Sequence, residues 1–388
     1  MTPSAVTTGR RRGSRRTPTR LGVHPLTIAG LVLALVASAV VLALRPPGRA
    51  AAPDRPPGAL AGLGEVWRQA KVTTMPGRLG DGRAYQPWFF IDATTSVGTA
   101  ITGDATRLVV RDPNGAAREI QRLSDDGNPQ FNSFATAGDE LIWMVAVSDA
   151  EGRATTALYK ADWRRGTPAV KLTDDTGDAL FFNSQYDLVV AEGRIRWVAA
   201  ARTESPVTEL RSIPLAGGTV TTQRIEGAWA HSAWPLLTSF GSGQAGPVDV
   251  IDAATGARRT VPAASNELVT CGPIWCRVVI LGATGSAARI DVMRLDGSGR
   301  QRIVGGGSVT PAVVDVALAG RFEVLSQANP VESASGSIKL MLHDITTDRT
   351  VVVAPAVATV LARGTVLWWS TGEAEATEWH VLDLAGLG

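Results

Sequence analysis

Two acidic segments contain the residues best suited to bind a cation or to act as catalytic acids. They are 123-LSDDGNPQFNSF-134 and 172-LTDDTGDALFFNSQYD-187, and each ends near a Phe-Asn-Ser tripeptide that we interpret as the start of the next strand. Calcium needs about six to eight oxygen ligands, and neither segment has the twelve-residue loop pattern that supplies them. Because Asp commonly serves turns, we expect solvated turn residues, with an acidic ligand rim as the alternative. The residues of that rim would be Asp125, Asp126, Asp174, Asp175 and Asp178.

The two cysteines lie in 270-TCGPIWCR-277, where Gly272-Pro273 predicts a turn. A redox pair of the thioredoxin type would have two intervening residues, and a metal site would need more ligands. In an oxidising compartment, Cys271 and Cys276 would face each other across a hairpin and form a disulfide. We predict a structural disulfide that contributes about 2 kcal/mol through the chain entropy of its short loop.

The histidines give no metal site. His24, His231, His343 and His380 are not spaced as metal ligands, and we predict neither a metal nor a cofactor. His343 and His380 fall on predicted strands. His231 lies in 229-WAHSAWP-235 between Trp229 and Trp234, which indicates a packed aromatic segment, or alternatively part of a ligand site.

Signatures of catalysis are missing from the sequence. It has no Gly-x-Ser-x-Gly elbow, zinc-protease helix motif, phosphate loop or sialidase-type Asp box. We therefore predict that the protein is not an enzyme. A pair of catalytic carboxylates on separate structural repeats needs no local spacing, so this alternative stays open.

The N-terminal region predicts a membrane anchor. Residues 1–53 contain no Asp or Glu, and an Arg-rich stretch precedes the uncharged run 26-LTIAGLVLALVASAVVLAL-44. A helix of this length spans about 28 Å, close to the hydrocarbon thickness of a bilayer. The arginines place the N-terminus in the cytoplasm and the rest outside. The apolar run is longer than that of a typical cleaved signal peptide, which is the competing interpretation because 50-AAAPD-54 offers small residues to a peptidase.

The charge distribution argues against a nucleic-acid partner. The chain has a net charge of +2, but residues 1–55 hold nine Arg and one acid, which leaves 29 basic and 35 acidic residues beyond them. The larger part is therefore acidic and has no basic stripe, so we expect neither DNA nor RNA as a partner. We divide the chain into a cytoplasmic tail (1–25), a transmembrane helix or signal anchor (26–44), a Pro-rich linker (45–64) and a folded domain (65–388).

The folded domain is built from a repeated hairpin. A strand, a polar turn and a second strand recur at 107–123, 157–173, 209–225, 248–262, 290–304 and 339–355, and a seventh copy at 378–388 lacks its second strand. The copies begin about 45 residues apart, the period of a four-stranded propeller blade. A second hairpin lies in most intervals, which gives four strands per period. We therefore predict an all-β fold, a seven-bladed β-propeller, with six or eight blades or an open sandwich array as alternatives.

The incomplete seventh copy predicts how the ring closes. The segment 71-KVTTMPG-77 resembles the fourth strands of other copies, such as 259-RTVPAA-264. We expect it to pair with residues 378–384, so that the first strand completes the last blade. Trp143, Trp197, Trp275 and Trp368 follow the inner turns and are predicted to pack between neighbouring blades rather than to bind ligand.

One stretch carries a family resemblance. In 138-GDELIWMVAVSDAEGRATTALYKADWRRGTPAVKLTDDTGD-178, a Gly-Asp pair opens the inner hairpin, and an Ile-Trp strand, an exposed loop, Leu-Tyr, a Gly turn and a closing Leu-Thr follow. This pattern resembles the repeats of TolB-like and WD-like β-propellers over two blades. The usual Ser-Pro-Asp-Gly turn is absent, as is a separate N-terminal α/β domain. The resemblance implies the repeat architecture and an extracytoplasmic binding role.

Together these features predict a single-pass membrane protein that displays a noncatalytic propeller outside the cytoplasm. Its partners would be the membrane and a protein or cell-envelope ligand. The alternatives are a carbohydrate-active enzyme, a lyase or glycosidase with acids in the central channel, and a purely structural scaffold.

Overall fold

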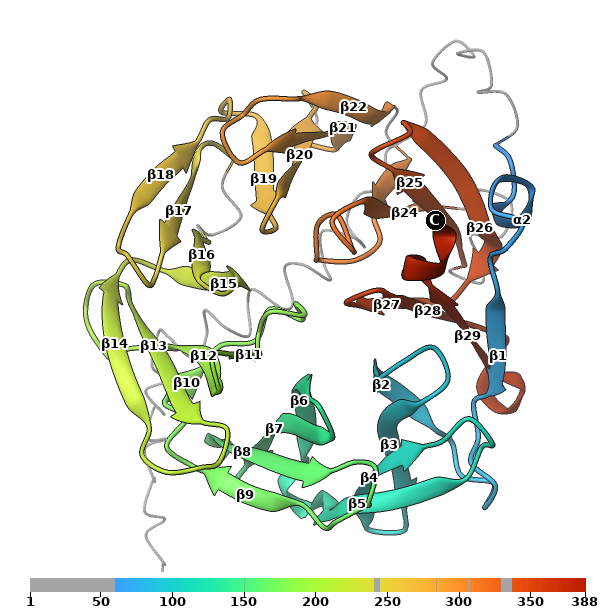
Figure 1. The fold of residues 1–388 in the computed structure, drawn as a ribbon, viewed down its shortest axis with the longest axis vertical. Coiled ribbons are helices and arrows are strands. Elements are labelled where there is room, and N and C mark those ends of the chain that lie inside the picture. Colours follow the sequence, from blue (N-terminus) through green and yellow to red (C-terminus); the bar gives the residue numbers. More distant parts are fainter. Residues whose placement is uncertain (1–59, 150, 241–244, 284, 306–307, 329–336) are drawn as a thin grey trace, which may run out of the picture. The chain divides into compact units, whose positions relative to one another are not determined.

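The computed structural model describes residues 60–388 except 150, 241–244, 284, 306–307 and 329–336. In this part of the chain the strands form seven antiparallel sheets that follow one another around a ring (Figure 1). The seven-bladed β-propeller predicted from the repeat is confirmed. The helix predicted over 26–44 lies outside the described residues, and no helix within them is long and apolar enough to cross a membrane.

Six blades are made of consecutive strands that run from the centre of the ring outward (Figure 1). Blade 1 has β2 (Gln86–Phe90), β3 (Ser96–Thr102), β4 (Ala105–Arg111) and β5 (Ala117–Ser124). Blade 2 has β6 (Gln130–Ala137), β7 (Glu140–Ser148), β8 (Ala154–Asp162) and β9 (Val170–Thr173). Blade 3 has β10 (Asp178–Ala179) and β11 (Val189–Ala191), which both pair with β12 (Arg194–Ala200), then β13 (Val207–Pro214) and β14 (Thr221–Glu226).

Blade 4 has β15 (Trp229–Ala233), β16 (Leu236–Ser239), β17 (Val248–Asp252) and β18 (Arg258–Val261). Blade 5 has β19 (Glu267–Cys271), β20 (Trp275–Leu281), β21 (Ala287–Arg294) and β22 (Gln301–Gly305). Blade 6 has β23 (Val309–Pro311), β24 (Phe322–Ala328), β25 (Ile338–Asp344) and β26 (Arg349–Val357). The described residues also form three short 3-10 turns: η1 (Asp125–Gly127), η2 (Ala374–Ala376) and η3 (Leu384–Leu387).

Blade 7 joins the two ends of the folded domain. It contains β27 (Thr359–Arg363), β28 (Val366–Thr371) and β29 (Glu378–Asp383), and its outer strand is β1 (Val72–Pro76). The antiparallel register places Val72 opposite Leu382 and Thr73 opposite Val381. The predicted pairing of 71–77 with 378–384 is therefore confirmed, and the ring closes without leaving a long unpaired edge at this point.

The segment before β1 also belongs to the fold. Ala61 O accepts a hydrogen bond from Val352 N at 2.9 Å. The short helix α2 (Leu63–Val66) carries Leu63 into the core, and Trp67 packs edge-on against Phe322 with ring centroids 5.9 Å apart. The folded domain thus begins a few residues before position 65, where the sequence placed its start.

Apolar side chains fill the spaces between adjacent blades. The four predicted tryptophans, Trp143, Trp197, Trp275 and Trp368, are all at least nine-tenths buried, as expected. Trp143 and Trp197 pack against the preceding blade, whereas Trp275 and Trp368 pack against the following one. The difference arises because successive strand residues point to opposite faces, so a shift of one residue reverses the blade that is contacted.

The remaining structural expectations concern cysteine and histidine. Cys271 and Cys276 lie opposite each other in the β19–β20 hairpin and form the predicted disulfide, with Cα atoms 4.0 Å apart. His343 and His380 lie on β25 and β29, the third strands of blades 6 and 7, as predicted. His343 Nδ1 contacts Thr350 Oγ1 at 2.9 Å, and His380 Nε2 contacts Thr371 Oγ1 at 2.7 Å.

Candidate functional site

A segment of blade 3 crosses the centre of the ring. Residues 180–187, here called the crossing segment, connect β10 to β11 and extend toward the inner strand of blade 7 (Figure 1). Gln185 O accepts a hydrogen bond from Arg363 Nη2 at 3.0 Å, and its Oε1 accepts one from Gly364 N at 2.8 Å. Residues separated by about half of the chain are thereby joined across the channel.

Two buried carboxylates hold the crossing segment in place. Asp315, from blade 6, accepts hydrogen bonds from Ser184 Oγ at 2.6 Å and from Gln185 N at 3.0 Å. Asp187 Oδ2 accepts from the backbone N–H groups of Phe182 at 2.9 Å and Ser184 at 3.2 Å, which folds the segment back on itself. Asp315 thus binds the hydroxyl of Ser184 and Asp187 binds its backbone N–H, so the two carboxylates together fix the position of this residue.

Blade 5 supports this arrangement through a buried ion pair. Arg277 Nε lies 2.7 Å from Glu323 Oε2, and both side chains are almost fully buried. The same guanidinium donates to the backbone oxygens of Val313, Val314 and Asp315. A buried charge needs such complete pairing to be tolerated. The loop that carries Asp315 is therefore fixed by the neighbouring blade.

The electrostatics of the crossing point follow from burial. Burial raises the pKa of Asp187 to about 7, although two backbone N–H donors and Arg363 oppose the shift. Burial likewise raises the pKa of Asp315 and lowers that of Arg363 to about 10. Near neutral pH, the carboxyl of Asp187 is therefore partly protonated, whereas the guanidinium of Arg363 keeps its charge.

A pocket of about 530 Å³ lies between the crossing segment and the inner strands of blades 1, 2 and 7; we call it the channel pocket. Trp88 and Ile101 line it and are unusually exposed for large apolar residues, at 41% and 63%. The indole Nε1 of Trp88 donates to Thr99 Oγ1 at 2.9 Å, which fixes the ring. Asn132 and Asn183 also line the pocket, as does Arg363. The pocket thus offers an apolar surface, amide groups, one cation and the carboxyls of Asp125 and Asp187.

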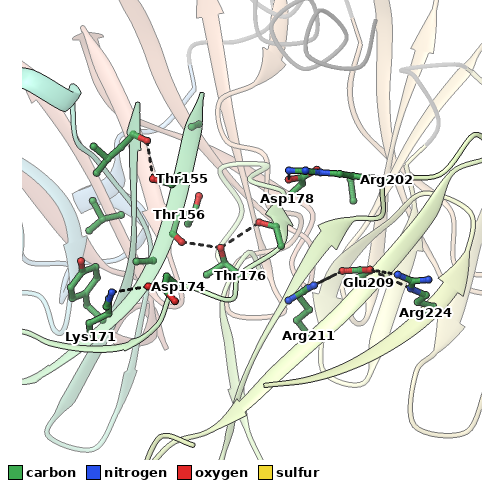
Figure 2. Close-up of a pocket in the computed structure, with 17 residues that line it drawn as sticks. Thr155, Thr156, Lys171, Asp174, Thr176, Asp178, Arg202, Glu209, Arg211 and Arg224 are labelled. Carbon is green, nitrogen blue, oxygen red and sulfur yellow. Dashed lines mark hydrogen bonds and ion pairs between the residues drawn. The ribbon is translucent and has the colours of Figure 1, made fainter. Parts of the chain in front are cut away.

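A second hollow lies between blades 2 and 3, and we call it the interblade groove. Its volume is about 790 Å³. Figure 2 shows Thr155 and Thr156 on one wall and Arg211, Glu209 and Arg224 on the other, with Thr176 between them. Thr176 Oγ1 donates to Thr156 O at 3.0 Å. Unlike the channel pocket, this groove is lined mainly by charged and hydroxyl-bearing side chains.

The five predicted rim aspartates separate into two groups. Asp125 lines the channel pocket, where its Oδ1 accepts from Thr106 Oγ1 at 2.6 Å, and Asp126 is an exposed residue of the same 3-10 turn. Asp174 pairs with Lys171, Asp175 with Arg211 and Asp178 with Arg202, at 2.6 to 2.8 Å. The hydrogen bond from Arg202 lowers the pKa of Asp178. The structure therefore brings the aspartates to two places, and in the second each is matched by a cation.

The aromatic segment 229–235 lies at the boundary of blades 3 and 4. Trp229 is buried and donates through Nε1 to Glu226 O at 2.7 Å. Trp234 is covered by the guanidinium of Arg196, 3.8 Å from the ring centroid. His231 is buried, and this burial lowers its pKa to about 3. None of the three lines the channel pocket or the interblade groove.

Several residues of the site were not selected from the sequence. Trp88, Asp187, Asp315 and Arg363 lie in four different blades, and no local motif connects them. One signal was present: Phe-Asn-Ser occurs at 131–133 and again at 182–184. From Phe131 to Trp143 there are 12 positions, and from Phe182 to Trp197 there are 15. The longer spacing accommodates three more residues, 185–187, of which Gln185 forms hydrogen bonds with Arg363 and Gly364 across the channel.

Among the described residues, no group of three His, Cys, Asp or Glu side chains could hold a metal ion. Comparison with known proteins shows no family. No family model matches the sequence, and no curated protein matches it. The family resemblance to TolB-like and WD-like repeats therefore stays a prediction.

Some solved structures are similar to this chain at low identity. A puromycin-hydrolyzing peptidase of Mycobacterium tuberculosis is 17% identical with a TM-score of 0.48, over 84% of this chain and 53% of that one. A puromycin hydrolase mutant is 16% identical with a TM-score of 0.47, over 74% and 48%. An uncharacterized protein of Listeria monocytogenes EGD-e is 11% identical with a TM-score of 0.48, over 78% and 93%. This chain spans about half the length of the two hydrolases, and likeness at this level carries no argument about function.

Proposed function

We propose that this protein is a noncatalytic binding module that takes its ligand in the channel pocket. The observation that carries the proposal is the exposed indole of Trp88 in the same pocket as the guanidinium of Arg363. Binding sites commonly combine an apolar surface with a few convergent polar groups. A ligand that fits would have one flat apolar face and one anionic group, as acidic sugars and the carboxyl ends of peptides do.

The carboxylates at the crossing point support a binding role over a catalytic one. Both oxygens of Asp315 accept hydrogen bonds from the crossing segment, and Asp187 Oδ2 accepts two from its backbone. These groups are thus engaged in shaping the pocket. Arg363 Nη2 in turn donates to Gln185 O, which holds the crossing segment against the wall that carries Arg363.

The proposal is tested by measuring ligand binding to the full-length protein. Hexuronic acids, matched neutral hexoses and short peptides with free or amidated carboxyl ends serve as probes in saturation-transfer NMR. Retention of an acidic probe by the wild type, and at least tenfold weaker binding by Trp88→Ala and by Arg363→Gln, is the expected result. The exposed Val170, which does not line the pocket, provides the control variant Val170→Ala. Equal binding by all variants would contradict the proposal.

A carbohydrate-active enzyme is the second candidate, because Asp125 and Asp187 line the same pocket. A carboxyl with a pKa near 7, as at Asp187, is suited to donate a proton to a leaving group. Glycosidases place two such carboxyls within about 5 to 10 Å of each other. Release of reducing ends or unsaturated products from acidic polysaccharides, abolished by Asp187→Asn, would favour the enzyme over the binding module.

We place this binding module outside the cytoplasm, tethered by a helix at 26–44. The support comes from the sequence: the arginines before the apolar run, the Pro-rich linker after it, and the disulfide, which is typical of an oxidising compartment. Cysteine substitutions at position 5 and at the exposed Thr203 test this topology through their labelling by a membrane-impermeant maleimide. Only the second position should react in intact cells, and the reverse pattern would contradict the orientation.

A further inference from the structure

The outer edge of blade 2 is incomplete, and this feature creates the interblade groove. On its inner side, β8 pairs with β7 along its whole length, from Ala154 opposite Ser148 to Asp162 opposite Glu140. On its outer side, β9 pairs only with Leu158, Tyr159 and Lys160. In blade 3, by contrast, β14 pairs with β13 continuously from Val207 to Ser212. Residues 154–157 of β8 therefore form a strand edge without a strand partner, and all four line the groove.

Backbone groups of this edge face the groove. Thr156 O is contacted from that side by the hydroxyl of Thr176, which shows the direction in which the carbonyl points. In a strand, the N–H and C=O of one residue point to the same side, and this side alternates between successive residues. Ala154 and Thr156 therefore direct their backbone groups to the groove. Apart from Thr156 O, which Thr176 already engages, this edge of about four residues, near 13 Å, offers these groups to a short extended peptide.

On the opposite wall of the groove, which blade 3 forms, the arginines have more hydrogen-bond donors than the neighbouring carboxylates engage. Arg202 and Arg224, with side chains 86% and 68% exposed, each use Nε and Nη2 on a carboxylate of the same wall. Asp178 gives both oxygens to Arg202, and Glu209 gives both to Arg211 and Arg224. The Nη1 groups of Arg202 and Arg224 remain for a ligand, whereas these two carboxylates are already engaged. A peptide in the groove should therefore bring acceptors, meaning acidic side chains.

The close approach of the two blades at this point requires a glycine. Gly177 has a φ of +63°, and a Cβ there would lie 2.6 Å from Arg211 Nε. The chain thus leaves β9 after Thr173, turns at Gly177 and enters blade 3 without pairing as a strand with residues 154–157, and only Thr176 contacts this edge, through its hydrogen bond to Thr156 O. The unpaired edge follows from this early departure.

We propose that the interblade groove binds an extended, acidic segment of a partner protein, which adds as a strand to the outer edge of β8. This site is separate from the channel pocket and does not depend on the function proposed for it. Strand addition supplies affinity through backbone hydrogen bonds, and the arginines of blade 3 select the acidic side chains.

The test uses the full-length protein and fluorescein-labelled octapeptide mixtures in an anisotropy titration. The probe mixture has Glu or Asp at alternate positions with Val, Thr or Tyr between them. One control mixture has Lys in place of the acids, and another has the backbone N-methylated at alternate residues. The probe should bind, and both controls should bind at least tenfold more weakly. Arg202→Glu/Arg224→Glu should weaken the probe at least tenfold, whereas the exposed Arg164→Glu should leave it unchanged.

Three results would overturn the proposal. The first is no binding of the acidic mixture at millimolar concentration. The second is equal binding of the N-methylated mixture, which would mean charge attraction without strand addition. The third is self-association of the protein alone that is lost in Arg202→Glu/Arg224→Glu, since the groove would then hold a second copy of the chain.

Discussion

Blades 2 and 3 contain the same tripeptide, Phe-Asn-Ser, near the centre of the ring and use it differently. In blade 2, Phe131-Asn132-Ser133 stays within the inner strand β6, where Ser133 has a φ of +52° and the pairing with β7 shifts register. In blade 3, Phe182-Asn183-Ser184 lies outside the strands, within the crossing segment. Its Ser184 and the following Gln185 supply the hydrogen bonds across the channel, to Asp315, Arg363 and Gly364. The same tripeptide thus belongs to a strand in blade 2 and to a contact across the channel in blade 3.

The prediction with the largest expected effect removes the buried ion pair that supports the crossing segment of blade 3. Arg277→Ala leaves Glu323 buried and unpaired and releases the loop that carries Asp315. We expect a loss of about 3–5 kcal/mol in the free energy of unfolding, measured by urea titration. The control is Arg78→Ala at the exposed pair with Glu375, which should change it by less than about 1 kcal/mol. Equal losses in the two variants would mean that the buried pair has no special role.

A second test changes one of the three inserted residues. Since the pKa of Asp187 is about 7 in the fold against an ordinary 3.8, the unfolded chain loses its proton first as the pH rises. The folded state is therefore progressively destabilised up to about pH 7, and below about pH 4 this cost disappears. Asp187→Asn keeps an acceptor oxygen but does not titrate. The wild type should lose about 2–3 kcal/mol more than this variant between pH 5 and pH 8. Parallel pH profiles of the two proteins would refute the assignment.

The prediction with the smallest expected effect compares Ser133 and Ser184, the serines of the two Phe-Asn-Ser copies. Ser184 Oγ donates to the Asp315 carboxylate at 2.6 Å, whereas Ser133 Oγ is buried with no hydrogen-bond partner among the described residues. Ser184→Ala should cost about 1.5–3 kcal/mol of unfolding free energy, and Ser133→Ala should be within about 0.5 kcal/mol of the wild type. Chemical denaturation of both variants decides it. Similar costs would mean that the two copies are equivalent after all.

The fold could be predicted from the sequence because its period and its end are both encoded locally. Hairpins recur about 45 residues apart, and the last one lacks a strand that residues 71–77 can supply. The burial of the four tryptophans follows from the same pattern. The blade that each one contacts does not, because it depends on a register shift of a single residue in strands of otherwise similar sequence.

The candidate site could be predicted only in part. The longer spacing after the second Phe-Asn-Ser copy indicates an insertion, but it does not reveal which residues the inserted segment contacts. Asp315 and Arg363 are about 130 and 178 positions from Gln185, and their approach depends on the curvature of the whole ring. The acidic rim was inferred from charge alone. Its residues at 174–178 lie beside cations from β9, β13 and the β12–β13 loop, which the local sequence does not reveal.

The closing pair of strands has a consequence for how the molecule is made. Val72 is among the first residues of the domain to leave the ribosome, and its partner Leu382 is among the last, 310 positions later. Contacts of such high sequence separation form slowly, because loop-closure entropy must be overcome first. The edge of β1 therefore lacks its partner until β29 has been synthesised, and blade 7 cannot be completed before that point.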